Sequence, residues 1–186
     1  ILAFDQSIGL KPGYAQSFYD KGIALLKLQR YDDAIDAFGY ALNINPNYVN
    51  AFYYQGIAFT ELGRYKEAID GFDRALEIDP IHTLALYHRG AALMQVQHYT
   101  DAVSAFDALL AISPQYTAAI YEKGIALLHL SRYHEACQTL DEALDLNPSL
   151  ADAWLYKGIA LVSLDQSEDA IAAFDRALTL NPLRTE

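Results

Sequence analysis

The sequence predicts an all-α protein made of consecutive helix hairpins, and three observations carry this prediction. Similar residue types return at one constant spacing along nearly the whole chain, as from Gly22 to Gly56 and on to Gly90, and such a period is typical of a repeat architecture. Within each period the apolar residues are three or four positions apart, which is the spacing of helices and not of strands. A proline ends each period, where its missing N–H and fixed φ stop a helix.

Five units of equal length cover the chain, with the bounds 15–48, 49–82, 83–116, 117–150 and 151–184. Their most regular member is a glycine, at Gly22, Gly56, Gly90, Gly124 and Gly158. Twelve residues later an alanine follows, at Ala34, Ala68, Ala102, Ala136 and Ala170. A large apolar residue comes four positions further on, at Phe38, Phe72, Phe106, Leu140 and Phe174. The closing prolines are Pro46, Pro80, Pro114, Pro148 and Pro182.

The first unit shows how each hairpin is built. Phe18, Gly22 and Leu25 share one face of a first helix, and a second helix runs through Ala34. The short polar segment Gln29–Arg30 forms the turn between them. The four later units repeat this plan in order.

The two ends of the chain fit the same period. Phe4 and Pro12 stand one full period before Phe38 and Pro46 of the first unit. Residues 1–14 are therefore expected to be the tail of a truncated preceding repeat, and residues 185–186 the start of a missing continuation. A stacked array hides each face only against its neighbours, so such ends would favour end-to-end contacts.

A glycine inside a helix costs about 1 kcal/mol relative to alanine, so five glycines at one repeated place need a compensation. We expect glycine on the first helix and alanine on the second to let the two helix axes approach closely. The phenylalanines would then fill the space beside that contact.

The combined pattern resembles the tetratricopeptide repeat. A tyrosine opens the second helix at Tyr31, Tyr65, Tyr99 and Tyr133, and Trp154 matches the family's tryptophan. The resemblance implies antiparallel helix pairs stacked into a right-handed superhelical solenoid, with first helices on the concave face. It also implies a non-catalytic scaffold that binds peptides or protein segments.

If first helices line a concave face, the positions three before, one after and four after each glycine point into it. The position five after the glycine, as at Lys27, Glu61 and His129, would line its polar edge. The candidate groove residues are Tyr19, Ile23, Lys27, Tyr53, Ile57, Thr60, Glu61, Tyr87, Ala91, Met94, Tyr121, Ile125 and Leu128. Tyrosine offers apolar area and a hydroxyl at low entropic cost, which suits peptide recognition. Alternatively, the tyrosines pack between repeats and leave only their edges to a ligand. The occupant could be an amphipathic helix, an apolar peptide, another copy, or an omitted segment of the chain itself.

A charge pattern predicts contacts between successive hairpins. The residue before the glycine is basic in four units, at Lys21, Arg89, Lys123 and Lys157. Sixteen residues upstream of these cations stand Asp5, Asp73, Asp107 and Asp141. The second unit has neither charge, with Gln55 and Gly39 at the two places. We expect an ion pair from each second helix to the next first helix that fixes the stacking register.

Composition narrows the function classes. The formal charge of −11 opposes general nucleic-acid binding, and no apolar run is long enough to span a bilayer. Neither a phosphate-binding loop nor a nucleophile elbow is present. We expect no cofactor and no metal, because the histidines are dispersed; only His129 and His134 offer a remote possibility of a shared ion. Cys137 takes the place of Ile35 and is expected to be a small buried residue, compatible with a reducing cytoplasmic compartment.

Three functions follow as hypotheses. The leading one is a scaffold that holds a peptide or amphipathic helix in a concave groove lined by tyrosine and isoleucine. The second is a self-assembly module that joins copies through the groove or through open repeat ends. The third is a recognition arm of a larger enzyme.

Overall fold

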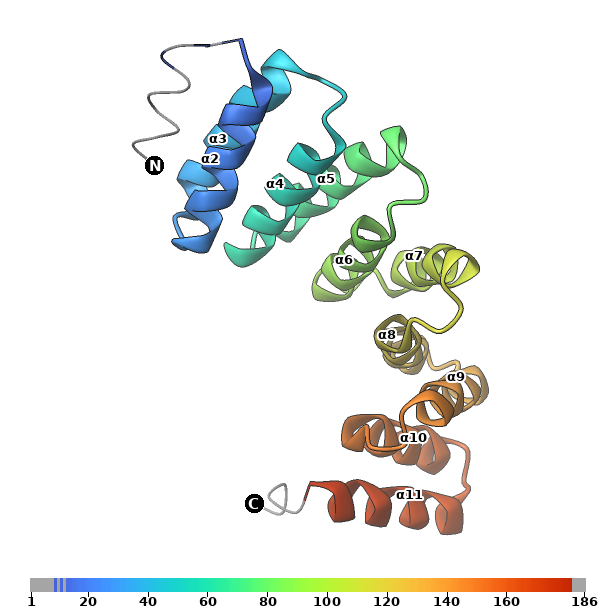
Figure 1. Ribbon diagram of the computed structural model, residues 1–186. Helices are drawn as coiled ribbons and strands as arrows, with labels where there is room; N and C mark the ends of the chain where they lie inside the picture. The colour runs from blue at the N-terminus through green and yellow to red at the C-terminus, as the bar shows by residue number, and fades with distance from the viewer. Residues whose placement is uncertain (1–8, 10, 12, 182–186) are drawn as a thin grey trace. The chain divides into compact units, whose positions relative to one another are not determined.

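The computed structural model describes residues 9, 11 and 13–181, and all regular secondary structure there is α-helical (Figure 1). The helices are α2 (Ala15–Lys27), α3 (Tyr31–Ile44), α4 (Val49–Glu61), α5 (Tyr65–Ile78), α6 (Thr83–Gln95), α7 (Tyr99–Ile112), α8 (Thr117–His129), α9 (Tyr133–Leu146), α10 (Ala151–Ser163) and α11 (Ser167–Leu180). The predicted all-α class is confirmed. The expectations for residues 1–8 and 182–186, including Phe4, and for Pro12 lie outside the described residues.

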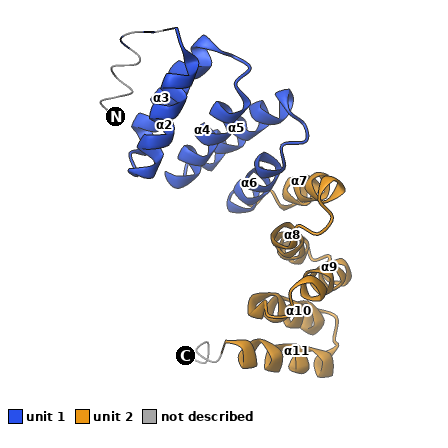
Figure 2. Cartoon of the chain, viewed as in Figure 1, with its two compact units in different colours: residues 1–96 blue, residues 97–186 orange. Residues whose placement is uncertain are grey.

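The chain forms two compact units (Figure 2). Unit 1 ends at Val96 and contains α2 to α6, and unit 2 begins at Gln97 and contains α7 to α11. Within each unit, every helix packs against the next one along the chain. The first and second helices of the hairpins α2–α3, α4–α5, α8–α9 and α10–α11 are therefore antiparallel neighbours joined by short turns.

Within each unit, the first helices of successive hairpins contact one another directly. In unit 1, α2 contacts α4 and α4 contacts α6, and in unit 2 α8 contacts α10. Second helices of the same unit, such as α3 and α5, make no comparable contact within the described part of the chain. The layer of first helices therefore lies on the inner side of the bend within each unit (Figure 1).

The repeated glycines sit directly beneath a large apolar side chain. A Cβ added to Gly22 would lie 2.5–2.8 Å from the ring of Phe38, and one added to Gly56 would lie 2.7–3.0 Å from Phe72. Leu140 covers Gly124 in the same way. The helices also approach closely, since a Cβ added to Gly71 on α5 would lie 3.2 Å from the backbone of Gly56, and the ring occupies the space that the missing side chain leaves. Phe38, Phe72 and Leu140 are fully buried at the centre of their hairpins, whereas Phe174, at the same place in α10–α11, is half-buried.

Each first helix of a hairpin ends in a turn with a left-handed residue. The N–H of Gln29 donates to the carbonyl of Leu26 at 2.9 Å, and the N–H of Arg30 donates to that of Leu25 at 3.0 Å. This pair of bonds is a Schellman motif, which satisfies the last carbonyls of the helix. Gln29 has φ 58°, and at the same place in the next hairpin stands Gly63 with φ 70°, where glycine carries no steric cost.

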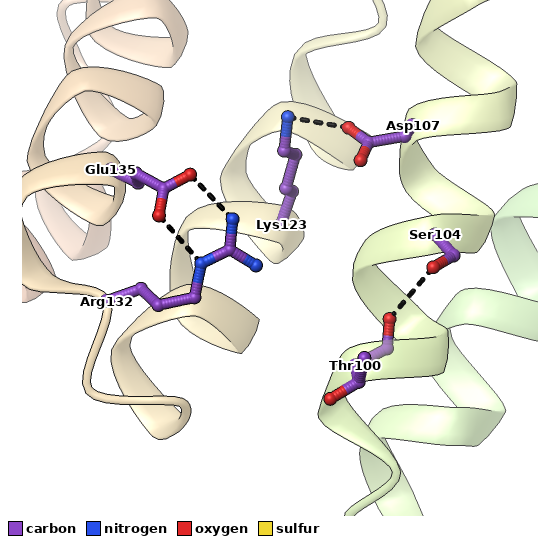
Figure 3. Close-up of polar contacts among 6 residues, drawn as sticks. All are labelled: Thr100, Ser104, Asp107, Lys123, Arg132 and Glu135. Carbon is purple, nitrogen blue, oxygen red and sulfur yellow. Dashed lines mark hydrogen bonds and ion pairs between the residues drawn. The ribbon is translucent and has the colours of Figure 1, made fainter.

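The predicted ion pairs between hairpins are confirmed wherever the structure describes both residues. Lys123 Nζ lies 2.6 Å from Asp107 Oδ1 (Figure 3), and Lys157 Nζ lies 2.5 Å from Asp141 Oδ1. Arg89 pairs with Asp73 in unit 1. Each pair joins a second helix to the following first helix, as the sequence predicted, and the role of the pairs in fixing the register between hairpins stays a prediction. Asp5, the proposed partner of Lys21, lies outside the described residues.

The junction between the first and second repeats, where α4 packs on α3, has a hydrogen bond in place of an ion pair. Gln55 Nε2 donates a hydrogen bond of 3.3 Å to the carbonyl oxygen of Ile35 on the preceding second helix. Gly39 lies beside this amide, and a Cβ added there would make only an ordinary contact of 3.9 Å with Gln55 Nε2. A side-chain-to-backbone bond therefore replaces the ion pair at this junction.

Candidate functional site

Two of the predicted groove tyrosines are held by aromatic neighbours in unit 1. The ring of Tyr19 stacks on Tyr48 with centroids 4.9 Å apart, and burial raises the pKa of its phenol to about 12. Tyr53 is only 6% exposed and lies 5.1 Å from the ring of His82 and 6.0 Å from Phe72. Packing between helices thus covers most of the surface of both rings. This agrees with the alternative interpretation, in which the tyrosines pack between repeats and leave only their edges to a ligand.

The other two predicted tyrosines are half-buried. Tyr87 on α6 has its ring 5.3 Å from His88, in an edge-to-face arrangement. Tyr121 on α8 has its ring 6.1 Å from Tyr156 on α10, so it spans two hairpins of unit 2. Both keep part of their surface open to solvent.

The apolar residues that directly follow the glycines differ in exposure. Ile23, Ile57 and Ala91 are partly exposed, whereas Ile125 is only 9% exposed. On α10 the corresponding Ile159 is 42% exposed. The exposed apolar area therefore varies along the series, which the uniform sequence pattern did not predict.

The next positions along the first helices are also accessible. Thr60, Met94 and Leu128 are partly exposed, and the hydroxyl of Thr60 donates to the carbonyl of Gly56 at 3.0 Å. Val162 on α10, at the same place, is 54% exposed. These side chains offer apolar area beside the tyrosines.

The predicted polar edge is exposed and partly held by tyrosines of the preceding hairpin. Lys27 and Glu61 are both exposed. The hydroxyl of Tyr31 donates to Glu61 Oε2 at 3.2 Å. In unit 2 the ring of Tyr99 stacks on His129 with centroids 4.4 Å apart and planes at 5°. In both units, the tyrosine that opens a second helix thus orients the edge residue of the next first helix.

The position two residues before the glycine packs a ring on the preceding hairpin in two repeats of unit 1, which the sequence pattern did not predict. Tyr54 stacks on Phe38 with centroids 6.2 Å apart, and His88 stacks on Phe72 at 6.0 Å. Burial lowers the pKa of His88 and raises the pKa of Glu122 at the same place on α8. A recurring tyrosine or histidine at this position could have indicated ring packing against the preceding phenylalanine.

Glu122 provides a test of this burial through the pH dependence of stability. Its pKa is higher in the folded than in the unfolded chain, so its contribution favours folding below its unfolded pKa and is lost as pH rises through the folded pKa. We expect Glu122→Gln to raise the melting temperature at pH 7 and to change it little at pH 4. Thermal unfolding followed by circular dichroism at both pH values measures the difference.

Glu135 is the matched control, with the opposite sign. A bidentate contact from Arg132, at 2.6 and 2.7 Å (Figure 3), lowers the pKa of this carboxyl group. Its stabilising contribution is therefore present above the unfolded pKa and is lost as pH falls. Glu135→Gln should not raise stability at pH 7. Equal responses of the two variants would contradict the burial argument.

Cavities lie on another side of the hairpins. One of about 600 Å³ is lined by Trp154, Lys157 and Arg176 among others. A cavity of about 240 Å³ lies at the same place in the hairpin α4–α5, beside Phe52 and Arg74. These hollows combine an aromatic ring with charges of both signs. They form a second candidate surface besides the face of the first helices that carries Tyr53, Ile57, Thr60 and their equivalents, here called the first-helix face.

The titratable side chains outside this face are relevant to two kinds of site, a metal site and a reactive thiol. Among residues 9, 11 and 13–181, His, Cys, Asp and Glu side chains form no group of three that could hold a metal ion. Cys137 is half-buried, and burial raises the pKa of its thiol. No helix in the described part of the chain is both long and apolar enough to cross a membrane.

Comparisons with solved structures identify proteins of similar fold. YrrB, described as a TPR protein with an unusual peptide-binding site, matches with a TM-score of 0.89 and 21% identity over 98% of this chain and 94% of YrrB. MamA of Desulfovibrio magneticus, from residue 41 onward, matches with a TM-score of 0.86 and 24% identity over 92% of this chain and 97% of that one. At these identities the likeness establishes the fold. No curated protein sequence matches the chain.

A family profile also matches the amino-acid sequence of this chain. The profile described as tetratricopeptide repeat matches residues 19–83, 87–151 and 121–184. These segments together cover most of the chain and include the glycine, alanine and phenylalanine places on which the resemblance rested. The chain belongs to the tetratricopeptide repeat family.

Proposed function

We propose that this protein is a non-catalytic interaction scaffold whose first-helix face binds a peptide or an amphipathic helix of another protein. The observation that carries the proposal is that these helices present tyrosine rings held by packing next to apolar side chains that are exposed to solvent. Tyr19 and Tyr53 are held by neighbouring rings, while Ile57 and Met94 in unit 1 keep exposed area. A surface that is rigid before binding loses less entropy when a ligand arrives.

Unit 2 supports the proposal in the same way. Tyr121 is anchored against Tyr156, while Ile159 and Val162 are 42% and 54% exposed. Exposed apolar side chains that gather on one face indicate an interaction site. In each unit a polar edge residue, Glu61 in unit 1 and His129 in unit 2, would then align a ligand through hydrogen bonds. YrrB, with its peptide-binding site, provides a precedent in the same fold.

The test begins with peptides selected from a displayed random library on the wild-type chain. Their affinities for two variants are then measured by fluorescence anisotropy. The first carries Thr60→Lys and Met94→Lys, which place two ammonium groups on the proposed face of unit 1 but remove no fully buried side chain. We expect it to bind at least about tenfold more weakly, because each desolvated charge opposes apolar contact.

The second variant, Arg74→Glu, is the control and tests the competing surface. Arg74 is exposed and lines the cavity beside Phe52. If binding uses the first-helix face, this variant should bind within about twofold of wild type. Loss of binding in Arg74→Glu, with normal binding in the double lysine variant, would place the ligand in the cavity beside Phe52 and contradict the proposal. Circular dichroism spectra of both variants check that the helices remain folded.

A further inference from the structure

Two histidines close over one of the groove tyrosines in unit 1. The ring of Tyr53 on α4 lies 5.1 Å from the ring of His82, which precedes α6, and 5.7 Å from the ring of His88 inside α6. His88 in turn stacks on Phe72 of α5 with centroids 6.0 Å apart. One cluster of rings therefore joins α4, α5 and α6, and it includes a residue of the first-helix face.

His82 also caps the start of α6. Its Nδ1 accepts a hydrogen bond of 3.1 Å from the backbone N–H of Ala85, one of the groups that the first turn of a helix leaves without a partner. Among helices α2 to α11, α6 is the one whose N-cap side chain accepts such a bond. A proton on Nδ1 would remove the acceptor and place a positive charge at the positive end of the helix dipole. The cap therefore requires the neutral ring.

Burial favours the neutral form of His88. The helices that pack against α6 in unit 1 are α4 and α5, and they leave this ring half-buried. Removal from water disfavours an imidazolium, so burial lowers the pKa of His88. Its stabilising contribution is therefore complete above the ordinary pKa of histidine, about 6.5, and is lost as pH falls through the lower folded value.

The acids of the neighbouring elements do not compensate for an added proton. On α5, Asp73 is the acid that contacts α6, and its carboxylate already pairs with Arg89. Asp79, in the turn before α6, accepts a hydrogen bond of 3.3 Å from a backbone N–H of the same turn. The acid of α4 is Glu61, at the last residue of that helix. In the described part of the chain, neither histidine forms an ion pair with an acid.

Tyrosine rings are the other titratable groups around the two histidines. Tyr53 of α4 contacts both, and Tyr87 of α6 contacts His88 edge to face. An imidazolium is attracted to the face of a tyrosine ring, which opposes the effect of protonation. This attraction does not restore the lost cap of α6 or return water to His88, and Arg89 adds a like charge at the next residue. Protonation of the two rings therefore weakens the start of α6.

We propose that His82 and His88 make the first-helix face of unit 1 sensitive to acid. When the two rings bind protons, the start of α6 loosens and Tyr53 loses the neighbours that hold it. The inference rests on the proposed function, because a peptide that binds this face then meets a less ordered surface and loses more entropy on binding. Binding in unit 1 accordingly weakens below about pH 6.

The first measurement concerns the free chain and needs no peptide. The matched variant combines His82→Asn with His88→Tyr, since asparagine caps a helix without titrating and a tyrosine stands at the place of His88 in Tyr54 and Tyr156. From pH 7 to pH 5, the melting temperature of wild type should fall by at least about 4 °C more than that of this variant. His134→Gln, at an exposed residue of α9, should respond to pH as wild type does.

Nuclear magnetic resonance of the wild-type chain tests the same inference without any substitution in the cluster. The protection of the Ala85 amide against hydrogen exchange should fall at least about threefold from pH 7 to pH 5.5, because its acceptor on His82 is lost. The imidazole signal of His88 should titrate at lower pH than it does in the urea-unfolded chain. Unchanged protection of Ala85, or equal falls in melting temperature for wild type and the double histidine variant, would overturn the inference.

Peptides selected on the wild-type chain at pH 7, and free of histidine, are the probes for the effect on binding. From pH 7 to pH 5.5, their affinity for wild type should fall at least about fivefold, and that for the double histidine variant less than about twofold. Equal losses in both, with weak binding by the double lysine variant at pH 7, would overturn the inference and leave the proposed function standing. Normal binding by the double lysine variant at pH 7 would contradict the proposed function, and the control of binding by pH with it.

Discussion

Replacing Phe72 with alanine is expected to lower the free energy of unfolding by about 3–5 kcal/mol. The side chain is 0% exposed and covers Gly56, and its ring also contacts Tyr53 and His88 at 6.0 Å. The truncation therefore opens a cavity inside one hairpin and at the junction with the next. Each hairpin of a repeat protein contacts only its neighbours, so damage at a junction weakens the coupling as well as the hairpin.

The measurement is urea and thermal unfolding followed by circular dichroism. A loss of this size corresponds to a fall in melting temperature of roughly 6–20 °C for a chain of this length. Because the junction is weakened, the unfolding transition should also broaden. Tyr40→Ala is the control, since it deletes an aromatic ring that is 58% exposed. It should cost less than about 1 kcal/mol. A Phe72→Ala variant as stable as this control would contradict the packing argument.

The ion pairs could be predicted from sequence because helices fix where their two residues stand. Asp107 and Lys123 lie on α7 and α8, and the repeat spacing sets both the rotation and the height of each helix. Long basic side chains then tolerate small errors in that geometry. The absence of both charges at Gln55 and Gly39 was informative for the same reason, since the amide makes a contact to the backbone there instead.

The exposure of the groove residues could not be predicted in the same way. Tyr53 and Tyr121 occupy equivalent places in their repeats, but Tyr53 is buried and Tyr121 is half-buried. The neighbours of Tyr53 include His82 and His88, whose rings close over it, and other repeats have different residues at those places. The pattern of one repeat therefore predicts which face a residue is on, whereas its accessible area depends on the side chains of the adjacent repeats.

Gly22→Ala is expected to destabilise the chain by about 1–3 kcal/mol, although alanine is the better helix former. The new methyl group would lie 2.5–2.8 Å from three ring atoms of Phe38. That ring is 0% exposed and is surrounded by other buried side chains, so it cannot move away without disturbing the core of the hairpin. The steric cost therefore exceeds the gain of about 1 kcal/mol from helix propensity. Urea unfolding of the variant and the wild type measures the difference.

Gly39→Ala measures the gain in helix propensity without the steric cost of a clash. Gly39 lies inside α3, and an added Cβ would make only an ordinary contact of 3.9 Å with Gln55 Nε2. This variant should be more stable than wild type by up to about 1 kcal/mol, because the gain in helix propensity meets no clash. Moreover, Gly22→Ala should become stabilising when it is introduced into Phe38→Ala, since the ring that opposes the methyl group is gone. If Gly22→Ala stabilises the chain with Phe38 in place, the repeated glycine is not required by the ring above it.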